Sequence, residues 1–246
     1  FSPEMNSYRD VLRVKNLSIG YDRELCKLSF DVERGDKLGI IGENGIGKST
    51  FLKTIMGEVS SLGGKFIFGD RVNIGYFSQA LDNLNYDNSI YEEIDKEFPR
   101  LTPNEIRTLL GTFEFSGDDV FKKIRDLSGG EKVRVSLCKI LNKKPNVLIL
   151  DEPTNHLDII SKDTIEKMLT SYKGTIIMVS HDRYLIKNVC NKLLVMEQGI
   201  GTLYNYGYQE YLDKTKINNV KKDFKVEKKK ISNKKVDTFD VNKEIK

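Results

Sequence analysis

Short runs of alternating apolar and polar residues mark the first part of the chain, and such alternation is typical of half-buried strands. The runs lie between Val11 and Ile41 and are separated by turn signals at Gly20 and at Gly35-Asp36. Further strand-like patches cover residues 66–68 and 72–77. The chain up to about residue 77 is therefore predicted to be rich in strands.

Helical spacing of apolar residues appears further along the chain. Thr102 is a cap residue, Pro103 follows it, and Glu105 stands three residues after the cap, which predicts a helix through about Leu110. Apolar residues recur at helical spacing in three more segments, 131–141, 161–172 and 184–191. Residues 80–126 are predicted to form a small helical subdomain.

Two continuous apolar runs, Val147 to Leu150 and Thr175 to Ser180, have the length of buried strands. Both runs lie between predicted helices. Strands that alternate with helices of this length indicate βαβ units. The predicted fold class is therefore α/β, with a mostly parallel sheet.

The composition is that of a folded globular protein, because 39% of the 246 residues are hydrophobic. No run approaches the roughly 18 apolar residues of a membrane span, and the first ten residues lack the regions of a signal peptide. The three cysteines are far apart and lack metal-ligand spacing, which argues against a disulfide framework or a zinc site. We therefore expect a cytoplasmic protein without an integral membrane segment.

The segment Gly42 to Thr50, GENGIGKST, has the spacing of a phosphate-binding loop, with a strand predicted before it and a helix after it. Its glycines permit backbone conformations that turn N–H groups towards an anion at a helix N-terminus. Lys48 is predicted to reach the β and γ phosphates of a nucleotide, and the Ser49 hydroxyl to bind Mg²⁺. A turn that merely links strand to helix is the alternative. The predicted phosphate-binding residues are Gly42, Asn44, Gly45, Gly47, Lys48, Ser49 and Thr50.

Asp151 and Glu152 follow a predicted buried strand, and ligands of open α/β sheets collect at the carboxyl ends of strands. Asp151 suits Mg²⁺ coordination, and Glu152 suits the general base that polarises an attacking water. An acidic exit from a strand without a catalytic role is the alternative. The phosphate loop favours the catalytic interpretation.

Leu127 to Glu131, LSGGE, places a hydroxyl and two glycines ahead of a predicted helix. Such a sequence can form a second anion site. It can equally form an ordinary helix cap, and the residues alone leave both interpretations open.

Taken together, these motifs resemble the ATP-binding cassette. The set consists of Walker A (Gly42 to Thr50), Gln79, the signature LSGGE (127–131), Walker B (Val147 to Glu152) and His181, and its order is highly specific. The resemblance covers about Val11 to Tyr206. It implies a P-loop NTPase fold with a mostly parallel core sheet, an antiparallel β subdomain and a helical signature subdomain, and it implies the hydrolysis of ATP with Mg²⁺.

The segments DEPTNHLD at residues 151–158 and SHDRY at residues 180–184 resemble the F subfamily. Proteins of that subfamily carry two cassettes on one chain and act on ribosomes. The resemblance implies that two cassettes close head to tail around two ATP molecules and reopen on hydrolysis. A second cassette and the ribosome, with its RNA, are thus the expected partners.

The resemblance also implies roles for single residues. Tyr21 would stack on adenine, with a strand aromatic packed in the core as the alternative. Gln79 would sense Mg²⁺ and the γ-phosphate, His181 would touch the γ-phosphate, and Asp158 would face the partner cassette. His156 is given no catalytic role. The residues expected to grip the nucleotide of the opposite cassette are Ser128, Gly129 and Gly130.

Gln79 and Ser128 are only 49 residues apart, whereas first cassettes of the F subfamily usually insert a helical arm between these motifs. The short spacing favours a second cassette, and the start at Phe1 indicates a piece of a longer polypeptide. The expected divisions are the end of a linker (1–10), the nucleotide-binding domain (11–212, with a helical subdomain at 80–130) and an extension (213–246). A first cassette followed by a linker is the rival interpretation.

The net charge of +4 comes from the predicted extension, where twelve lysines stand against six acidic residues. A solvated, disordered segment is the simplest interpretation. Contact with ribosomal RNA phosphates is the functional alternative.

A ribosome-bound ATPase, serving as a translation factor or in protection from antibiotics, is the favoured function. The alternative is the ATPase subunit of a membrane transporter that docks through residues 80–126. Glu131, where transporters frequently have glutamine, and the run at residues 154–158 favour the ribosome. A non-hydrolysing nucleotide-binding protein is a third option, which Glu152 and His181 argue against.

Overall fold

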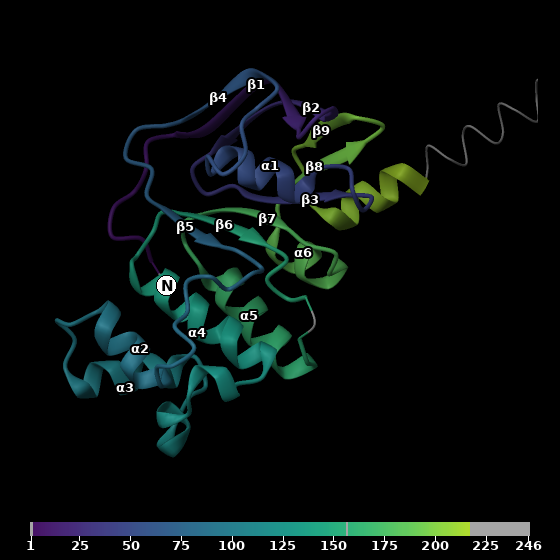
Figure 1. Ribbon diagram of the computed structural model, residues 1–246. Coiled ribbons are helices and arrows are strands. Elements are labelled where there is room, and N and C mark those ends of the chain that lie inside the picture. Colours follow the sequence, from purple (N-terminus) through teal and green to yellow (C-terminus); the bar gives the residue numbers. More distant parts are fainter. Residues whose placement is uncertain (1, 156, 217–246) are drawn as a thin grey trace, which may run out of the picture. The chain divides into compact units, whose positions relative to one another are not determined.

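The computed structural model describes residues 2–155 and 157–216, which belong to two compact units, 1–207 and 208–246. The first unit holds every named strand and helix (Figure 1). The described part of the second unit is a helix over residues 208–216. The predicted extension lies almost wholly outside the described residues, and so does His156.

The first unit is built on one nine-stranded sheet with the order β4-β1-β2-β9-β8-β3-β7-β6-β5. In chain order, the strands are β1 (Asp10–Gly20), β2 (Glu24–Glu33), β3 (Lys37–Gly42), β4 (Gly63–Phe68), β5 (Ile74–Phe77), β6 (Val147–Asp151), β7 (Thr175–Val179), β8 (Lys192–Glu197) and β9 (Ile200–Tyr204). Strand β3 pairs in parallel with β7 and β8, and β6 pairs in parallel with β5 and β7. Strand β1 pairs in antiparallel fashion with β2 on one side and with β4 on the other. The predicted α/β fold, with a parallel core and an antiparallel β region, is confirmed.

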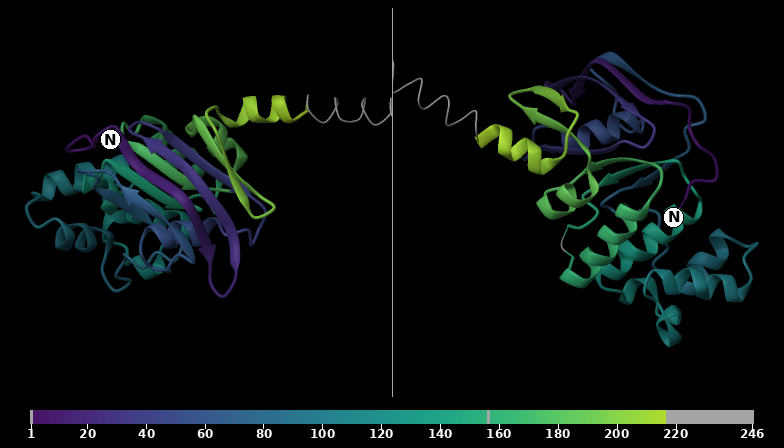
Figure 2. Two further views of the ribbon diagram at one scale, coloured as in Figure 1. Left: turned by 90° about the horizontal axis from the view of Figure 1, so that it is seen from above. Right: turned by 180° about the vertical axis from the view of Figure 1, so that it is seen from behind.

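The helices of the first unit lie between its strands in the sequence. They are α1 (Lys48–Ile55), α2 (Ile90–Glu97), α3 (Pro103–Thr112), α4 (Gly129–Asn142), α5 (Ile159–Ser171) and α6 (Arg183–Val189), with the short 3₁₀ turns η1 (Gly117–Phe121) and η2 (Ile124–Asp126). Helix α3 begins with the predicted capping box at Thr102 and Glu105. Helices α2 and α3 lie at the end of the unit away from the antiparallel strands (Figures 1 and 2). A helical region after residue 80 is therefore present.

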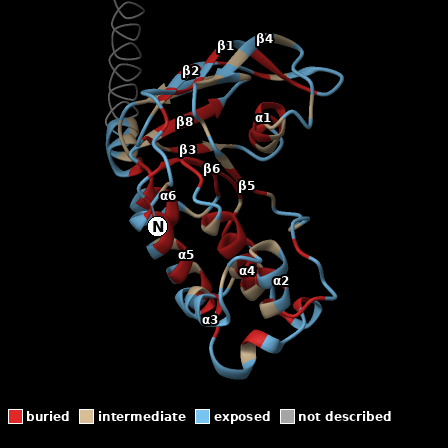
Figure 3. Ribbon diagram, turned by 90° about the vertical axis from the view of Figure 1, so that its left-hand side faces the viewer, coloured by how far each residue is buried: buried red, intermediate tan, exposed pale blue. Residues whose placement is uncertain are grey.

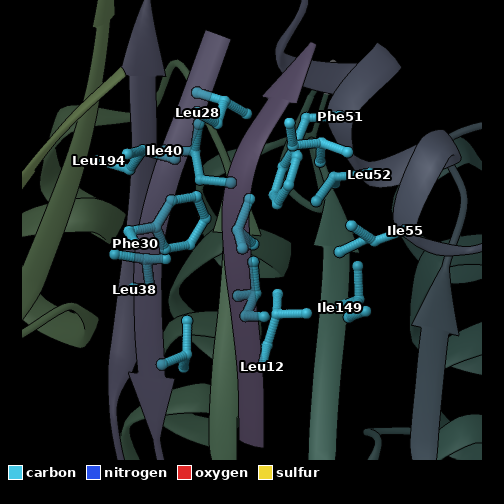
Figure 4. Packing of buried hydrophobic residues seen from close by; sticks show 14 of the residues in the cluster. Leu12, Leu28, Phe30, Leu38, Ile40, Phe51, Leu52, Ile55, Ile149 and Leu194 are labelled. Atoms are coloured by element: carbon cyan, nitrogen blue, oxygen red, sulfur yellow. The ribbon is translucent and has the colours of Figure 1, made fainter. Parts of the chain in front are cut away.

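The main hydrophobic cluster joins the antiparallel strands to the parallel ones. Phe51, Leu52 and Ile55 of α1 pack with Leu12 of β1, and the Phe30 and Phe51 rings lie 5.7 Å apart (Figure 4). Each fully buried side chain of this size stabilises the fold by about 1.5–3 kcal/mol. The central strands are buried on both faces (Figure 3). This packing fixes α1 and the loop before it against the sheet.

Some elements were not predicted. Strands β8 and β9 and helix α2 were not assigned. Helix α1 begins at Lys48, inside the segment 42–50 that was assigned to the phosphate loop, and not after it. Among the described residues, none of the helices has both the length and the apolar character needed to cross a membrane.

Candidate nucleotide site

The predicted phosphate loop connects the end of β3 with the start of α1. Gly45 has φ of +80° and Gly47 has φ of +106°, a region that favours glycine. A Cβ at Gly47 would lie 3.1 Å from Ile19 Cδ1, a tight contact that adds to the preference for glycine. These two residues curl the backbone ahead of the N-terminus of α1, where the helix dipole favours an anion.

Lys48 turns its ammonium group back over this loop. The Nζ donates hydrogen bonds of 2.9 Å to the carbonyl oxygens of Gly42 and Glu43. Burial lowers the pKa of Lys48, while the nearby carboxylates of Glu152 and Asp151 raise it. A partly desolvated ammonium held only by neutral oxygens is well suited to exchange them for phosphate oxygens.

Ser49 and Asp151 meet although they lie 102 residues apart in the chain, and the Ser49 Oγ donates a 2.9 Å hydrogen bond to Asp151 Oδ1. Burial raises the pKa of Asp151, and the Ser49 hydrogen bond opposes this effect. The pair offers a hydroxyl and a carboxylate oxygen, which are ligands that suit Mg²⁺. Among the described residues no cluster of three or more His, Cys, Asp and Glu side chains is arranged for a metal. Mg²⁺ here would thus need phosphate oxygens and water as further ligands.

Glu152 and His181 also come together, because β6 and β7 pair in parallel and end at the same edge of the sheet. The Glu152 Oε2 accepts a 3.1 Å hydrogen bond from the backbone N–H of His181, and the Oε1 lies 3.5 Å from His181 Nε2. The Oε1 atom is buried and has no hydrogen-bond partner. Only 11% of the Glu152 side chain is exposed, against 55% of His181. A buried carboxylate with a free oxygen can accept a proton from water.

These residues line one cavity of about 650 Å³, a size typical of small-molecule sites. Tyr21 is 58% exposed, so it is not the core aromatic of the alternative interpretation. Gln79 lies in the turn after β5. Of the predicted residues, the cavity brings together Tyr21, Asn44, Gly45, Gly47, Lys48, Ser49, Thr50, Gln79, Glu152 and His181. Gly42 and Asp151 join the set through their hydrogen bonds to Lys48 and Ser49.

Ser128, Gly129 and Gly130 do not line this cavity. Ser128 caps α4, because its Oγ accepts the N–H of Glu131 while the Glu131 carboxylate accepts the N–H of Ser128. The helix-cap interpretation therefore describes the geometry of this segment. Its expected grip on a nucleotide of another cassette stays a prediction.

The start of α4 packs against the start of α5. A Cβ at Gly130 would lie 2.4 Å from Ser161 Oγ and 3.2 Å from Asp158 Oδ2, whereas a Cβ at Gly129 would meet no atom within 4 Å. Asp158 accepts hydrogen bonds from the Ser161 N–H and Oγ, which lower its pKa. Arg134 of α4 donates a 2.9 Å hydrogen bond to Ser161 Oγ. The signature and the Asp158 segment are thus joined within one chain.

Two further residues line the cavity, Leu25 and Asn155. Asn155 lies three residues after Glu152 in the DEPTNHLD segment. Its position in that segment is the signal that could have placed it at the cavity. Leu25 is an ordinary apolar residue of β2, and nothing in the sequence indicates that it lines a ligand site.

Comparison with known proteins agrees with this geometry. The family described as ABC transporter matches residues 25–155. The chain is 42% identical over 217 residues to the "Putative ATP-binding protein YdiF" of Bacillus subtilis, covering 87% of this chain and 34% of that protein. It is 39% identical to "ABC transporter F family member 5" of Arabidopsis thaliana, covering 87% of this chain and 32% of that protein. The chain thus spans about a third of the length of the curated relatives it matches.

Among solved structures, cbiO1 from Clostridium perfringens, described as part of the ABC transporter complex cbiONQ, is similar with a TM-score of 0.68 and 27% identity. The similarity covers 86% of this chain and 94% of that one. The similarity therefore extends over most of this chain and nearly all of that protein.

Proposed function

This chain belongs to the ATP-binding cassette family and to its F subfamily, and from that premise we propose that it is one ATP-hydrolysing half of a two-cassette protein that acts on the ribosome. The observation that carries the proposal is the meeting of Lys48, Ser49, Glu152 and His181 around one cavity. The length of the relatives, about three times the matched segment, supports a second cassette on the same chain.

The chain's own residues supply each part of a hydrolytic reaction. The loop glycines and Lys48 bind and orient the phosphates, which lowers the entropy cost of reaching the transition state. Ser49 and Asp151 would hold Mg²⁺, which neutralises charge on the phosphate oxygens. Glu152 removes a proton from the attacking water, and its buried carboxylate is already oriented by the His181 N–H.

Closure by a second cassette completes the proposed site. Ser128 and Gly130 lie outside the cavity of their own chain. Ser128 is exposed and Gly130 is buried against Ser161, and the exposed start of α4 is proposed to contact a nucleotide on a partner. An isolated cassette is accordingly proposed to bind ATP and to hydrolyse it poorly. Binding energy then drives a closing and opening switch.

Glu152→Gln in the full two-cassette protein tests this proposal. The amide keeps the shape of the side chain and cannot act as a base, so turnover should fall at least about 100-fold while ATP binding persists. We expect the variant to stay closed with ATP bound and to co-sediment with ribosomes. Glu197→Gln, at the exposed end of β8, is the matched control and should behave as the wild type.

The runner-up function is the ATPase subunit of a membrane transporter, which the similarity to cbiO1 favours. Co-sedimentation of the Glu152→Gln protein with membranes, and no association with ribosomes, would replace the proposal by this alternative. ATP binding with no turnover in the wild-type two-cassette protein would instead indicate a non-hydrolysing protein.

A further inference from the structure

A second cavity, of about 420 Å³, adjoins the proposed nucleotide cavity. Glu152, Asn155 and His181 line both cavities, which therefore adjoin at these residues, and the smaller cavity is called the second lobe. The second lobe is formed by the starts of α5 and α6 and the turn after β6. Its remaining lining residues are Thr154, Lys162, Asp182, Arg183 and Tyr184.

Two cations, Lys162 and Arg183, line the second lobe, and they differ in their ion pairs. Lys162 pairs with Asp182 at 3.3 Å, and its side chain is 41% exposed. Asp182 is also engaged as the cap of α6, since its Oδ1 accepts the N–H groups of Tyr184 and Leu185. The lobe thus brings together two cations, Lys162 and Arg183, and two carboxylates, Glu152 and Asp182. Arg183 is the cation that forms no ion pair among the described residues.

Glu152 lines both cavities, whereas Arg183 and Lys162 line only the second lobe. Hydrolysis converts ATP and water into ADP and inorganic phosphate, and the phosphate forms beside Glu152. Arg183 and Lys162 attract the phosphate towards the second lobe, and the Asp182 carboxylate of the same lobe, which pairs with Lys162, weakens this attraction. The second lobe thus offers the released phosphate a route past two cations that do not line the nucleotide cavity.

We propose that the second lobe binds the inorganic phosphate released by hydrolysis, held by Arg183 and Lys162 before it leaves the protein. The inference rests on the proposed ATPase function and adds a product site to it. A guanidinium suits this task because its planar fork pairs bidentately with phosphate oxygens. No bond is made or broken at this site.

The test uses the two-cassette protein with inorganic phosphate as the probe. Phosphate is titrated as a product inhibitor of ATP turnover in the presence of ADP. We expect Arg183→Gln to raise the inhibition constant of phosphate about ten-fold, the effect of losing one charge-assisted hydrogen bond, and Lys162→Gln to raise it less. Broadening of the ³¹P resonance of phosphate by the ADP-bound protein gives a readout that does not depend on turnover.

Matched controls lie on the same helices. Lys187→Gln on α6 and Lys167→Gln on α5 remove exposed cations outside the lobe and should leave the inhibition constant unchanged. An unchanged constant in Arg183→Gln would overturn the inference. Weaker association of the cassettes with unchanged phosphate inhibition would also overturn it, by assigning Arg183 to a partner contact. A wild-type protein that does not hydrolyse ATP would remove the proposed function itself, which is seen before any variant is made.

Discussion

Glu152 is held in an unusual backbone conformation, with φ of 51°. This left-handed region costs a non-glycine residue about 1–2 kcal/mol. The backbone N–H of Glu152 donates a 3.0 Å hydrogen bond to the Val179 carbonyl of β7, and its carboxylate accepts the His181 N–H. The ends of β6 and β7 therefore fix both the backbone and the side chain of the proposed base.

Asp151 is expected to lower the stability of the fold while it serves the proposed function. Its pKa is raised by burial, so folding disfavours the charged form, and this group opposes stability above its unfolded pKa. Asp151→Asn keeps an oxygen acceptor for Ser49 and removes the buried charge. We expect an unchanged or higher melting temperature at pH 7, together with at least about a 100-fold loss of Mg²⁺-dependent turnover.

Thermal unfolding and ATP turnover of the same Asp151→Asn preparation check this prediction. A lower melting temperature at pH 7 would show that the carboxylate stabilises the fold. Retained turnover would remove Asp151 from the metal site.

The β8–β9 hairpin shows why some elements escape prediction from sequence. Glu197 pairs with Ile200, so Gln198 and Gly199 alone form the loop, with φ of 50° and 77°. Two left-handed residues are the signature of a type I′ turn, whose usual sequence is Asn-Gly or Asp-Gly. Gln-Gly is a weak form of that signal. By contrast, the strong capping box of α3 and the continuous apolar runs of β6 and β7 predicted their elements well.

The residues of the candidate site could also be predicted in part from the sequence. Sequence motifs indicated Ser49 and Asp151, and the structure brings them to 2.9 Å. The packing of Gly130 against Ser161 could not be predicted, because only the fold brings these two distant positions together. Local patterns report caps and turns, whereas contacts between helices depend on the whole chain.

The start of α4 allows a matched pair of glycine variants. Gly130→Ala should destabilise the fold by about 1–3 kcal/mol, because its Cβ would overlap Ser161 Oγ, which Asp158 and Arg134 hold in place. Gly129→Ala meets no atom and should be neutral or stabilising by up to about 1 kcal/mol. Urea unfolding of both variants measures the difference, and equal stabilities would contradict the contact.

A buried ion pair joins α2 to α4. Lys139 and Glu93 have side chains only 8% and 4% exposed and contact each other directly. Lys139→Met would leave the Glu93 charge buried and unpaired, so we expect a loss of about 3–5 kcal/mol. Lys143→Met removes a lysine that pairs with Glu97 but is 58% exposed, and it should cost less than about 1 kcal/mol. Denaturant unfolding compares the two, and similar losses would show that burial of the pair does not matter.

For the whole molecule, acid stability should depend on carboxylates that cap helices. Hydrogen bonds from the backbone and side chain of Ser89, together with Lys123, lower the pKa of Glu92 to about 2. A carboxyl with a lowered pKa stabilises the folded state fully above its unfolded pKa, which is about 4.3. This stabilisation is then lost as the pH falls through about 2.

Melting temperatures of the wild type and Glu92→Gln, measured between pH 7 and pH 2, test this effect. The wild type should be more stable above about pH 4.3, and the gap should narrow towards pH 2, where the wild-type carboxyl becomes protonated. A gap that does not change with pH would mean that the charge of Glu92 contributes nothing beyond its shape.

Gly130 packs on Ser161 beside Asp158, so the beginnings of α4 and α5 are tied together. In the head-to-tail pair proposed above, the start of α4 would face one ATP, and Glu152 and Asp158 would face the other. Binding of ATP at one site would then affect the other site through contacts within a single cassette. The rate of turnover in the paired protein should accordingly rise sigmoidally with ATP concentration, and weakening this one junction should make the curve hyperbolic.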